Sequence, residues 1–131
     1  MKSRKLVFVF GVFFAIAALV AACGPGSSGG GTNNPGAQTI NVDASEFEYK
    51  PSEISTKPGE LVTINFKNSG TVEHTFVIKE ANLKIVAQPG QTVKETFKAP
   101  MTAGTYVIHC DVAGHTEAGM QGKLTVVAAQ N

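Results

Sequence analysis

The sequence contains no tryptophan, and it has only two cysteines and three histidines among its 131 residues. Its charge is almost balanced, with eleven Lys and Arg against ten Asp and Glu, and the basic residues form no stripe. Because nucleic-acid-binding domains generally carry a basic stripe, we expect no nucleic-acid partner. No convincing helical stripe of apolar residues is present either, which argues against a helical bundle. The length is that of one domain of ordinary size.

The first 22 residues predict an export signal. Lys2, Arg4 and Lys5 precede an uncharged, largely apolar run that ends in small residues before Cys23. A basic head, an apolar middle and small residues before the cleavage point are typical of a secretory signal peptide. The uncharged run over residues 6–23 is also long enough to keep a transmembrane helix as an alternative. Against that alternative, a Gly- and Ser-rich segment without positive charge follows the run.

The segment V-A-A-C at residues 20–23 resembles the bacterial lipobox, which implies that Cys23 becomes the lipidated first residue of the mature chain. Two acyl chains suffice for stable anchoring where one is marginal. We therefore expect an exported protein, anchored by lipid on the periplasmic or extracellular side of a bacterial membrane. Removal of residues 1–22 takes away three basic residues, which leaves eight basic against ten acidic residues in the mature chain.

The two cysteines need separate explanations. In an exported protein, the simplest alternative is a disulfide between Cys23 and Cys110. Lipidation would block Cys23 and exclude that bond. Cys110 is then a lone thiol in an exported protein, which indicates a ligand or a reactive group.

Residues 23–38 form the next predicted unit, a lipidated Cys followed by a Gly/Ser-rich segment without apolar periodicity. Such a composition is typical of a flexible tether. The alternative is a terminal tail without a role. Residues 39–131 form the predicted folded domain.

From residue 39 onward, apolar residues recur at every second position in several short segments, as at Val62, Ile64 and Phe66. This period is typical of half-buried strands. Turn sequences such as Pro58-Gly59, Asn68-Ser69-Gly70 and Pro89-Gly90 separate the segments, and a short helical turn is expected at residues 80–84. The pattern predicts an all-β domain, an antiparallel Greek-key β-sandwich of seven or eight strands.

One segment, residues 106–122, carries three potential metal ligands. Cys110, His115 and Met120 follow one another at intervals of five, and His74 lies in a separate apolar segment upstream. Two imidazoles, one thiolate and one thioether are the ligand set of a blue-copper electron-transfer site, because it lies between the preferences of Cu(I) and Cu(II). Strand parity turns Cys110 to the same face as Ile108 and Tyr106, and turns His109 to the other face.

Each candidate ligand also has a simpler explanation. A buried Cys is often a small apolar residue, Met120 could fill the core, and a lone His is more often structural than a ligand. A structural zinc site and a Cys–His catalytic dyad are further alternatives. Zinc sites rarely use Met, and a dyad leaves Met120 and one histidine unexplained. The joint pattern favours copper.

Residues 68–76, N-S-G-T-V-E-H-T-F, and residues 105–126, T-Y-V-I-H-C-D-V-A-G-H-T-E-A-G-M-Q-G-K-L-T-V, resemble the plastocyanin/azurin family of cupredoxins, and most of all its auracyanin-like bacterial members. The resemblance covers residues 39–128. It implies a cupredoxin-like sandwich that binds one copper ion, with His74, Cys110 and His115 as equatorial ligands and Met120 as the axial ligand. It also implies that Thr75 and Asp111 brace the two ligand-bearing segments through hydrogen bonds.

The resemblance implies transfer of single electrons, and together with the predicted lipid anchor it predicts a membrane-tethered carrier that docks transiently with redox proteins such as cytochromes or oxidase and reductase complexes. His115 and His109 are the possible electron routes, because His115 is expected to expose an edge and His109 is bonded directly to Cys110. One alternative is a periplasmic copper chaperone or sequestering protein. Another is an enzyme, because in nitrite reductases a His at the position of His109 binds a second, catalytic copper.

Overall fold

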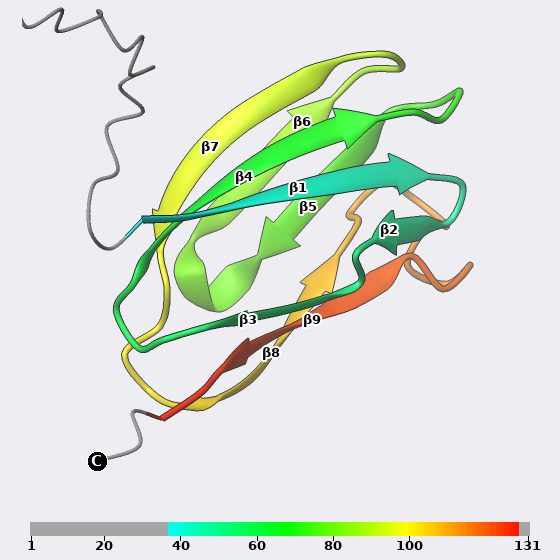
Figure 1. Cartoon of the computed structure of the whole chain (residues 1–131). Helices are drawn as coiled ribbons and strands as arrows, with labels where there is room; N and C mark the ends of the chain where they lie inside the picture. The colour runs from blue at the N-terminus through cyan, green and yellow to red at the C-terminus, as the bar shows by residue number, and fades with distance from the viewer. Residues whose placement is uncertain (1–36, 129–131) are drawn as a thin grey trace, which may run out of the picture. The chain divides into compact units, whose positions relative to one another are not determined.

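The computed structural model describes residues 37–128 (Figure 1). The predicted signal peptide, Cys23 and nearly all of the predicted tether lie outside these residues. Within the described part, the chain forms nine strands and one short 3₁₀ turn. In chain order they are β1 (Ala37–Ser45), β2 (Glu48–Lys50), β3 (Glu53–Thr56), β4 (Leu61–Asn68), β5 (His74–Ile78), η1 (Lys79–Ala81), β6 (Leu83–Ala87), β7 (Thr92–Lys98), β8 (Gly104–His109) and β9 (Gln121–Val126). None of the helices described between residues 37 and 128 has the length and apolar character needed to cross a membrane.

The strands form two sheets, one in the order β2-β1-β4-β7 and the other in the order β3-β9-β8-β5-β6. Figure 1 shows β1, β4 and β7 side by side in one layer and β8 and β9 in the other. The chain passes repeatedly from one sheet to the other, as it does between β3, β4 and β5. The predicted all-β sandwich is therefore confirmed.

Strand direction and strand number require a correction. The sheets are mixed rather than purely antiparallel, because β1 runs parallel to β4 and β3 runs parallel to β9. The nine strands in the described residues exceed the predicted seven or eight. A period of two reveals which face of a strand is buried, but it does not reveal which strand lies beside it or in which direction. The three-residue β2 and the four-residue β3 are too short to show a period.

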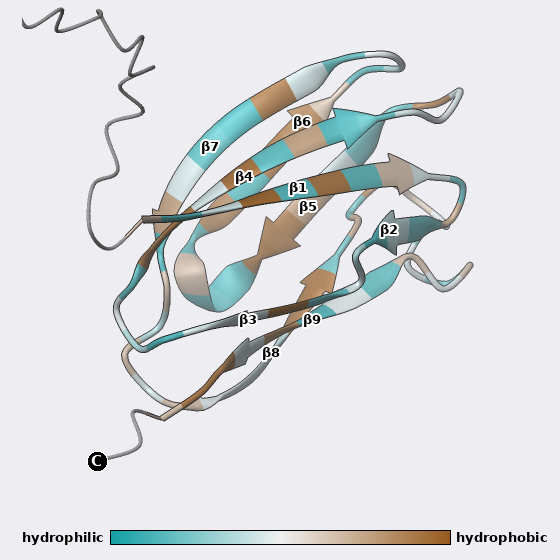
Figure 2. Cartoon of the chain, viewed as in Figure 1, coloured by the Kyte–Doolittle hydropathy of each residue, from teal (hydrophilic) through white to brown (hydrophobic). Residues whose placement is uncertain are grey.

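Apolar residues at alternate positions form the core between the sheets, and Figure 2 shows brown and teal alternating along β4. Phe66 on β4 and Phe76 on β5 are both fully buried, and their ring centroids lie 5.7 Å apart. Tyr49 on β2 lies edge-on to Phe76 at 5.5 Å. Its hydroxyl donates a hydrogen bond to the backbone oxygen of Thr75 at 2.5 Å. These three rings fix β5, the strand that begins with His74, against the opposite sheet.

The structure differs from three local expectations. β1 begins at Ala37, slightly ahead of the predicted domain start at Thr39. The helical turn lies at Lys79–Ala81 and ends at Asn82 in the left-handed region, with φ of 49°. Asn68, expected in a turn, is the fully buried last residue of β4. Its side-chain amide donates to the backbone oxygens of Val72 and Ala87, each at 2.8 Å.

Strand pairing brings the ligand-bearing segments together. β5 and β8 are antiparallel neighbours, and Val77 pairs with His109. Cys110, the residue after His109, therefore lies next to the first residues of β5. This pairing places Cys110 beside Thr75 and His74, although the two segments are far apart in the sequence.

The ring cluster generates a prediction for stability. We expect Phe66→Ala to lower the free energy of unfolding of the metal-free protein by about 3–5 kcal/mol, because it leaves a cavity between the two sheets. The measurement is urea unfolding followed by circular dichroism. Leu61→Ala is the matched control on the same strand, since Leu61 is 41% exposed, and it should change the free energy by only about 0.5 kcal/mol. Equal effects of the two substitutions would contradict the assigned core.

Candidate metal centre

Three potential ligand atoms converge at one end of the sandwich. The Nδ1 atoms of His74 and His115 lie 3.2 Å apart, and Cys110 Sγ lies 3.4 Å from His115 Nδ1. All three atoms lie within 4.8 Å of one another. His74 and Cys110 are fully buried, and His115 is 8% exposed. In the described part of the chain, these residues are the one group of three or more His, Cys, Asp or Glu placed to hold a metal ion.

The β8–β9 loop brings His115 and Met120 back to Cys110 through backbone hydrogen bonds. The amide of His115 donates to Val112, the amide of Met120 donates to His115 at 2.9 Å, and the amide of Cys110 donates to Met120 at 3.3 Å. Gly114 and Gly119 have φ of 84° and 98°, a region that L side chains rarely adopt. The side chain of Met120 is fully buried. The loop therefore places the thioether residue beside the thiol residue.

Thr75 and Asp111 connect the two ligand-bearing segments. Thr75 Oγ1 donates to Asp111 Oδ1 and accepts from the Asp111 amide, both at 2.8 Å. The Thr75 amide also donates to Cys110 Sγ at 3.4 Å. The Lys84 ammonium, 2.7 Å from Asp111 Oδ2, and the Thr75 hydroxyl lower the pKa of the Asp111 carboxyl. Each of the Thr75 bonds joins the neighbour of His74 to Cys110 or to Asp111, so contacts within the protein hold His74 beside Cys110.

The electrostatic environment of His74 favours a neutral imidazole. Burial lowers the pKa of His74, and the adjacent His115 lowers it further. A neutral imidazole is the form that binds a metal. Its Nδ1 faces the other donors, while its buried Nε2 has no hydrogen-bond partner among residues 37–128.

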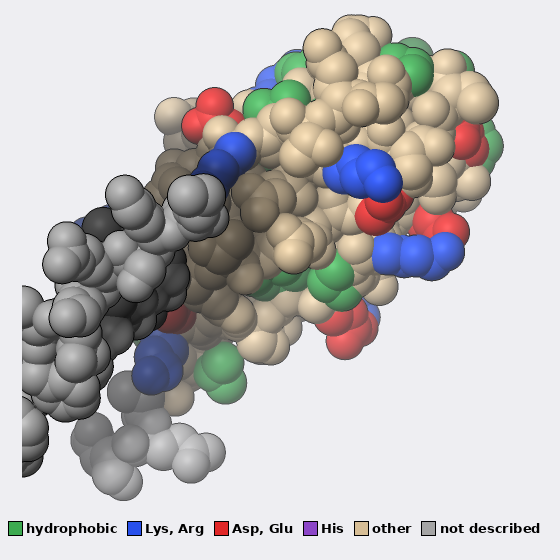
Figure 3. Space-filling view, turned by 45° about the horizontal axis from the view of Figure 1, so that its top comes forward, with side chains coloured by type: hydrophobic (Ala, Val, Ile, Leu, Met, Phe, Trp, Pro, Cys, Tyr) green, Lys and Arg blue, Asp and Glu red, His purple; other side chains and the backbone are tan. Residues whose placement is uncertain are grey.

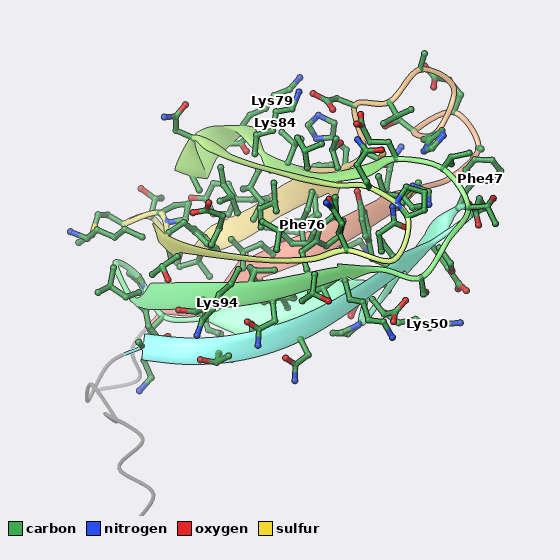
Figure 4. All side chains as sticks on the ribbon, turned by 90° about the horizontal axis from the view of Figure 1, so that it is seen from above. Phe47, Lys50, Phe76, Lys79, Lys84 and Lys94 are labelled. Carbon is green, nitrogen blue, oxygen red and sulfur yellow. The ribbon has the colours of Figure 1, made fainter. Side chains whose placement is uncertain are left out.

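Two residues that the sequence pattern did not single out border the centre. The Glu46 carboxylate lies near His74, with Oε1 3.7 Å from Nε2. The Thr71 amide, which donates to this carboxylate, lowers the pKa of Glu46 to about 2. The ring of Phe47 lies edge-on to His115 with centroids 5.1 Å apart and is 43% exposed. Figure 4 shows Phe47 at the end of the molecule that carries the β8–β9 loop. Both residues lie between β1 and β2. Their spacing in the sequence from the predicted ligands gives no indication that they lie beside the centre.

His109 lies apart from the three donors. It is the last residue of β8 and is half-buried. It borders a surface depression on the other side of the strand, together with Lys79, Glu80 and Thr116. Strand parity predicted this separation from Cys110.

The residues present fit a copper ion. Atoms that share one metal ion at distances of about 2.0–2.3 Å lie about 3–4 Å apart, as the two Nδ1 atoms and Sγ do here. Two imidazoles and a thiolate, with a buried Met nearby, are the donors of a type 1 copper site. The orientation of the His74 ring agrees with metal binding through Nδ1, because Nδ1 faces His115 Nδ1 at 3.2 Å and leaves Nε2 as the outer nitrogen.

Comparisons with known proteins agree with this geometry. The structure is similar to auracyanin A, a "blue" copper protein from Chloroflexus aurantiacus, with a TM-score of 0.60 and 30% identity over 70% of this chain and 100% of that one. It is also similar to the dithionite-reduced auracyanin of Roseiflexus castenholzii, with a TM-score of 0.62 and 27% identity over 70% of this chain and 98% of that one.

The copper-containing nitrite reductase of Thermus scotoductus SA-01 shares the fold, with a TM-score of 0.62 and 21% identity over 73% of this chain and 29% of that one. No curated protein matches the sequence. A family model described as the cupredoxin-like domain matches residues 10–126, which is most of the chain. With this match and the convergence of His74, Cys110 and His115, the protein belongs to the cupredoxin-like family and has the donor set of a type 1 copper centre.

Proposed function

We propose that this protein carries single electrons between redox proteins by means of one copper ion bound to His74, Cys110, His115 and Met120. The observation that carries the proposal is the convergence of two imidazole nitrogens and one cysteine sulfur, all buried, at separations of 3.2 and 3.4 Å. A copper ion bound there supplies a one-electron couple between Cu(II) and Cu(I).

The contribution of the chain is stiffness and exclusion of water. His74 is held on β5, and Cys110 is held beside it by the Thr75 amide and by the Thr75–Asp111 pair. Because these contacts join protein groups on both ligand-bearing segments, they resist movement of the donors when the charge of the site changes. A site that stays fixed during electron transfer lowers the reorganisation that accompanies each step.

The surface around His115 supports brief docking of a partner. Ala113, Gly114, Ala118 and Gly119 are exposed around this histidine, and Phe47 adds an exposed ring. Small interfaces are characteristic of weak electron-transfer encounters. On the face shown in Figure 3, acidic and basic side chains are interspersed, which suits mild electrostatic steering. The proposed partners are redox proteins such as cytochromes or oxidase and reductase complexes.

The proposed location follows from the sequence of residues 1–23. The signal-like segment and the lipobox-like V-A-A-C support export and lipid attachment through Cys23. Residues 23–36 would then tether the folded domain to the outer side of a membrane. A tethered carrier meets membrane-bound partners more often than a free one, because the tether raises its local concentration.

Copper delivery or sequestration is the alternative function. The burial of the donors favours the carrier, because a delivery protein must release its ion to a partner, whereas His74 and Cys110 are fully enclosed. The rate of copper release distinguishes the two. We propose a slow release in the presence of a competing chelator.

The first test of the proposal is the absorption spectrum. Cu(II) added to the purified protein should produce an intense visible band from the bond between copper and the Cys110 thiolate, at one copper per chain. Cys110→Ser should abolish the band, whereas His109→Gln should retain it. A colourless copper adduct in the unchanged protein, or a band that persists in Cys110→Ser, would refute the type 1 assignment.

The brace between the ligand-bearing segments generates a second prediction. Thr75→Val removes the hydroxyl that bonds Asp111, and we expect copper affinity to fall about 10- to 100-fold. The measurement is competition against a chelator of known affinity. Thr63→Val is the matched control, because Thr63 is also a buried strand residue with a hydroxyl bond, here to Thr96. Equal losses in both variants would show that the effect is not specific to the brace.

The proposed anchor can be tested separately from copper. In a bacterial host, the protein should enter the membrane fraction and incorporate a labelled fatty acid. Cys23→Ser should abolish both properties, and Cys110→Ser should preserve them. Labelling that persists in Cys23→Ser would contradict the proposed lipidation.

A further inference from the structure

We propose that Glu46 is the outer partner of His74: its carboxylate accepts the Nε2 hydrogen of the metal-bound imidazole and thereby holds the ring and stabilises Cu(II). This inference rests on the proposed function, because it assumes that His74 binds copper through Nδ1. It assigns a positioning and potential-setting role to a residue outside the ligand set.

The first observation is the state of the His74 ring. Its Nδ1 faces His115 Nδ1 at 3.2 Å, so Nε2 is the nitrogen that remains when Nδ1 binds a metal. Nε2 is buried, and it has no hydrogen-bond partner within residues 37–128. A ligating histidine almost always donates this second hydrogen to a carboxylate, a backbone oxygen or water. The ring therefore requires an acceptor on this side.

The second observation is the position of the Glu46 carboxylate. Its Oε1 lies 3.7 Å from His74 Nε2, which is less than an ångström beyond the usual range of an N–H···O bond of about 2.7–3.2 Å. The same oxygen accepts from the Thr71 amide at 2.6 Å, from the Thr71 hydroxyl at 3.1 Å and from the Val72 amide at 3.2 Å. These bonds tie the carboxylate to the segment that precedes His74. An ionised carboxylate has two oxygens with about four acceptor positions, so capacity remains for the imidazole.

The third observation is the space between the two side chains. A Cβ atom at Gly70 would lie 2.8 Å from His74 Nε2 and 2.6 and 2.9 Å from the two oxygens of Glu46. Such contacts are too short for a real side chain. Glycine at position 70 therefore leaves open the path along which the carboxylate and the imidazole can approach each other.

A carboxylate in this position changes the metal preference of the site. It makes the imidazole a stronger donor, and it places a negative charge close to the ion. Both effects stabilise the higher charge of Cu(II) more than that of Cu(I), and they lower the reduction potential. Loss of the carboxylate should weaken Cu(II) binding about 10- to 100-fold. For a one-electron couple, each tenfold loss confined to Cu(II) raises the potential by about 59 mV.

The first experiment measures the hydrogen bond itself in the Zn(II)-substituted full-length protein, which is diamagnetic. The Nε2 hydrogen of His74 should give a downfield proton signal with slow solvent exchange in a ¹H–¹⁵N spectrum. In Glu46→Gln, which keeps an acceptor for the Thr71 and Val72 amides, the signal should move upfield and exchange faster. Glu48→Gln, which removes one exposed charge nearby, should leave it unchanged. An identical His74 signal in all three proteins would overturn the assignment.

The second experiment measures the reduction potential of the copper form. Glu46→Gln should raise the potential by about 59 mV or more, and Glu48→Gln should change it far less. Gly70→Ala should also raise it, since its methyl group wedges the carboxylate away from the ring. Equal potentials for Glu46→Gln and Glu48→Gln would overturn the assignment. If the unchanged protein lacks the copper–thiolate band, the proposed function fails, and the zinc spectra still decide whether Glu46 holds His74.

Discussion

The connection between β5 and the end of β8 is the constraint on which the rest of the structure depends. A metal centre of this kind needs donors from segments 36 residues apart to remain within a few ångströms of one another, and Thr75 and Asp111 provide that link with two reciprocal bonds of 2.8 Å. The pairing of Val77 with His109 supplies the register. The ring cluster of Phe66, Phe76 and Tyr49 keeps β5 seated against the opposite sheet. Because each part supports the next, the donor geometry is a property of the whole sandwich.

The charged and neutral groups around the centre are also set by the fold. The donors are buried, and burial keeps His74 in the neutral form that can bind a metal. Two carboxylates border the centre, Asp111 beside Cys110 and Glu46 beside His74. Hydrogen bonds from neighbouring groups lower the pKa of both and favour their ionised form. A site that gains and loses one positive charge benefits from fixed negative charge at a short distance. Because these carboxylates lie outside the ligand set, the ligands themselves are the nitrogen and sulfur donors that copper prefers.

The likeness to known cupredoxins establishes the fold and supports the donor set, whereas the partners and the location are proposed from other features of the chain. The two auracyanins align with nearly their whole length, whereas the nitrite reductase aligns with a fraction of its own length and shares the fold at lower identity. Cupredoxin sandwiches thus occur in small proteins and as parts of larger enzymes. The single group of donors in residues 37–128 and the exposed apolar surround of His115 are the reasons for proposing a carrier here.

Much of this protein could be predicted from its sequence. Alternation of apolar residues identified the strands and their buried faces, and parity separated Cys110 from His109, because both depend on local backbone geometry. The spacing of Cys110, His115 and Met120 indicated copper, because the ligand types themselves carry the chemistry. Only the tertiary structure decided that β1 runs parallel to β4 and β3 parallel to β9, that Asn68 is buried, and that Glu46 and Phe47 border the centre. These features join residues distant in sequence through packing, and packing between distant segments leaves no periodic trace in the chain.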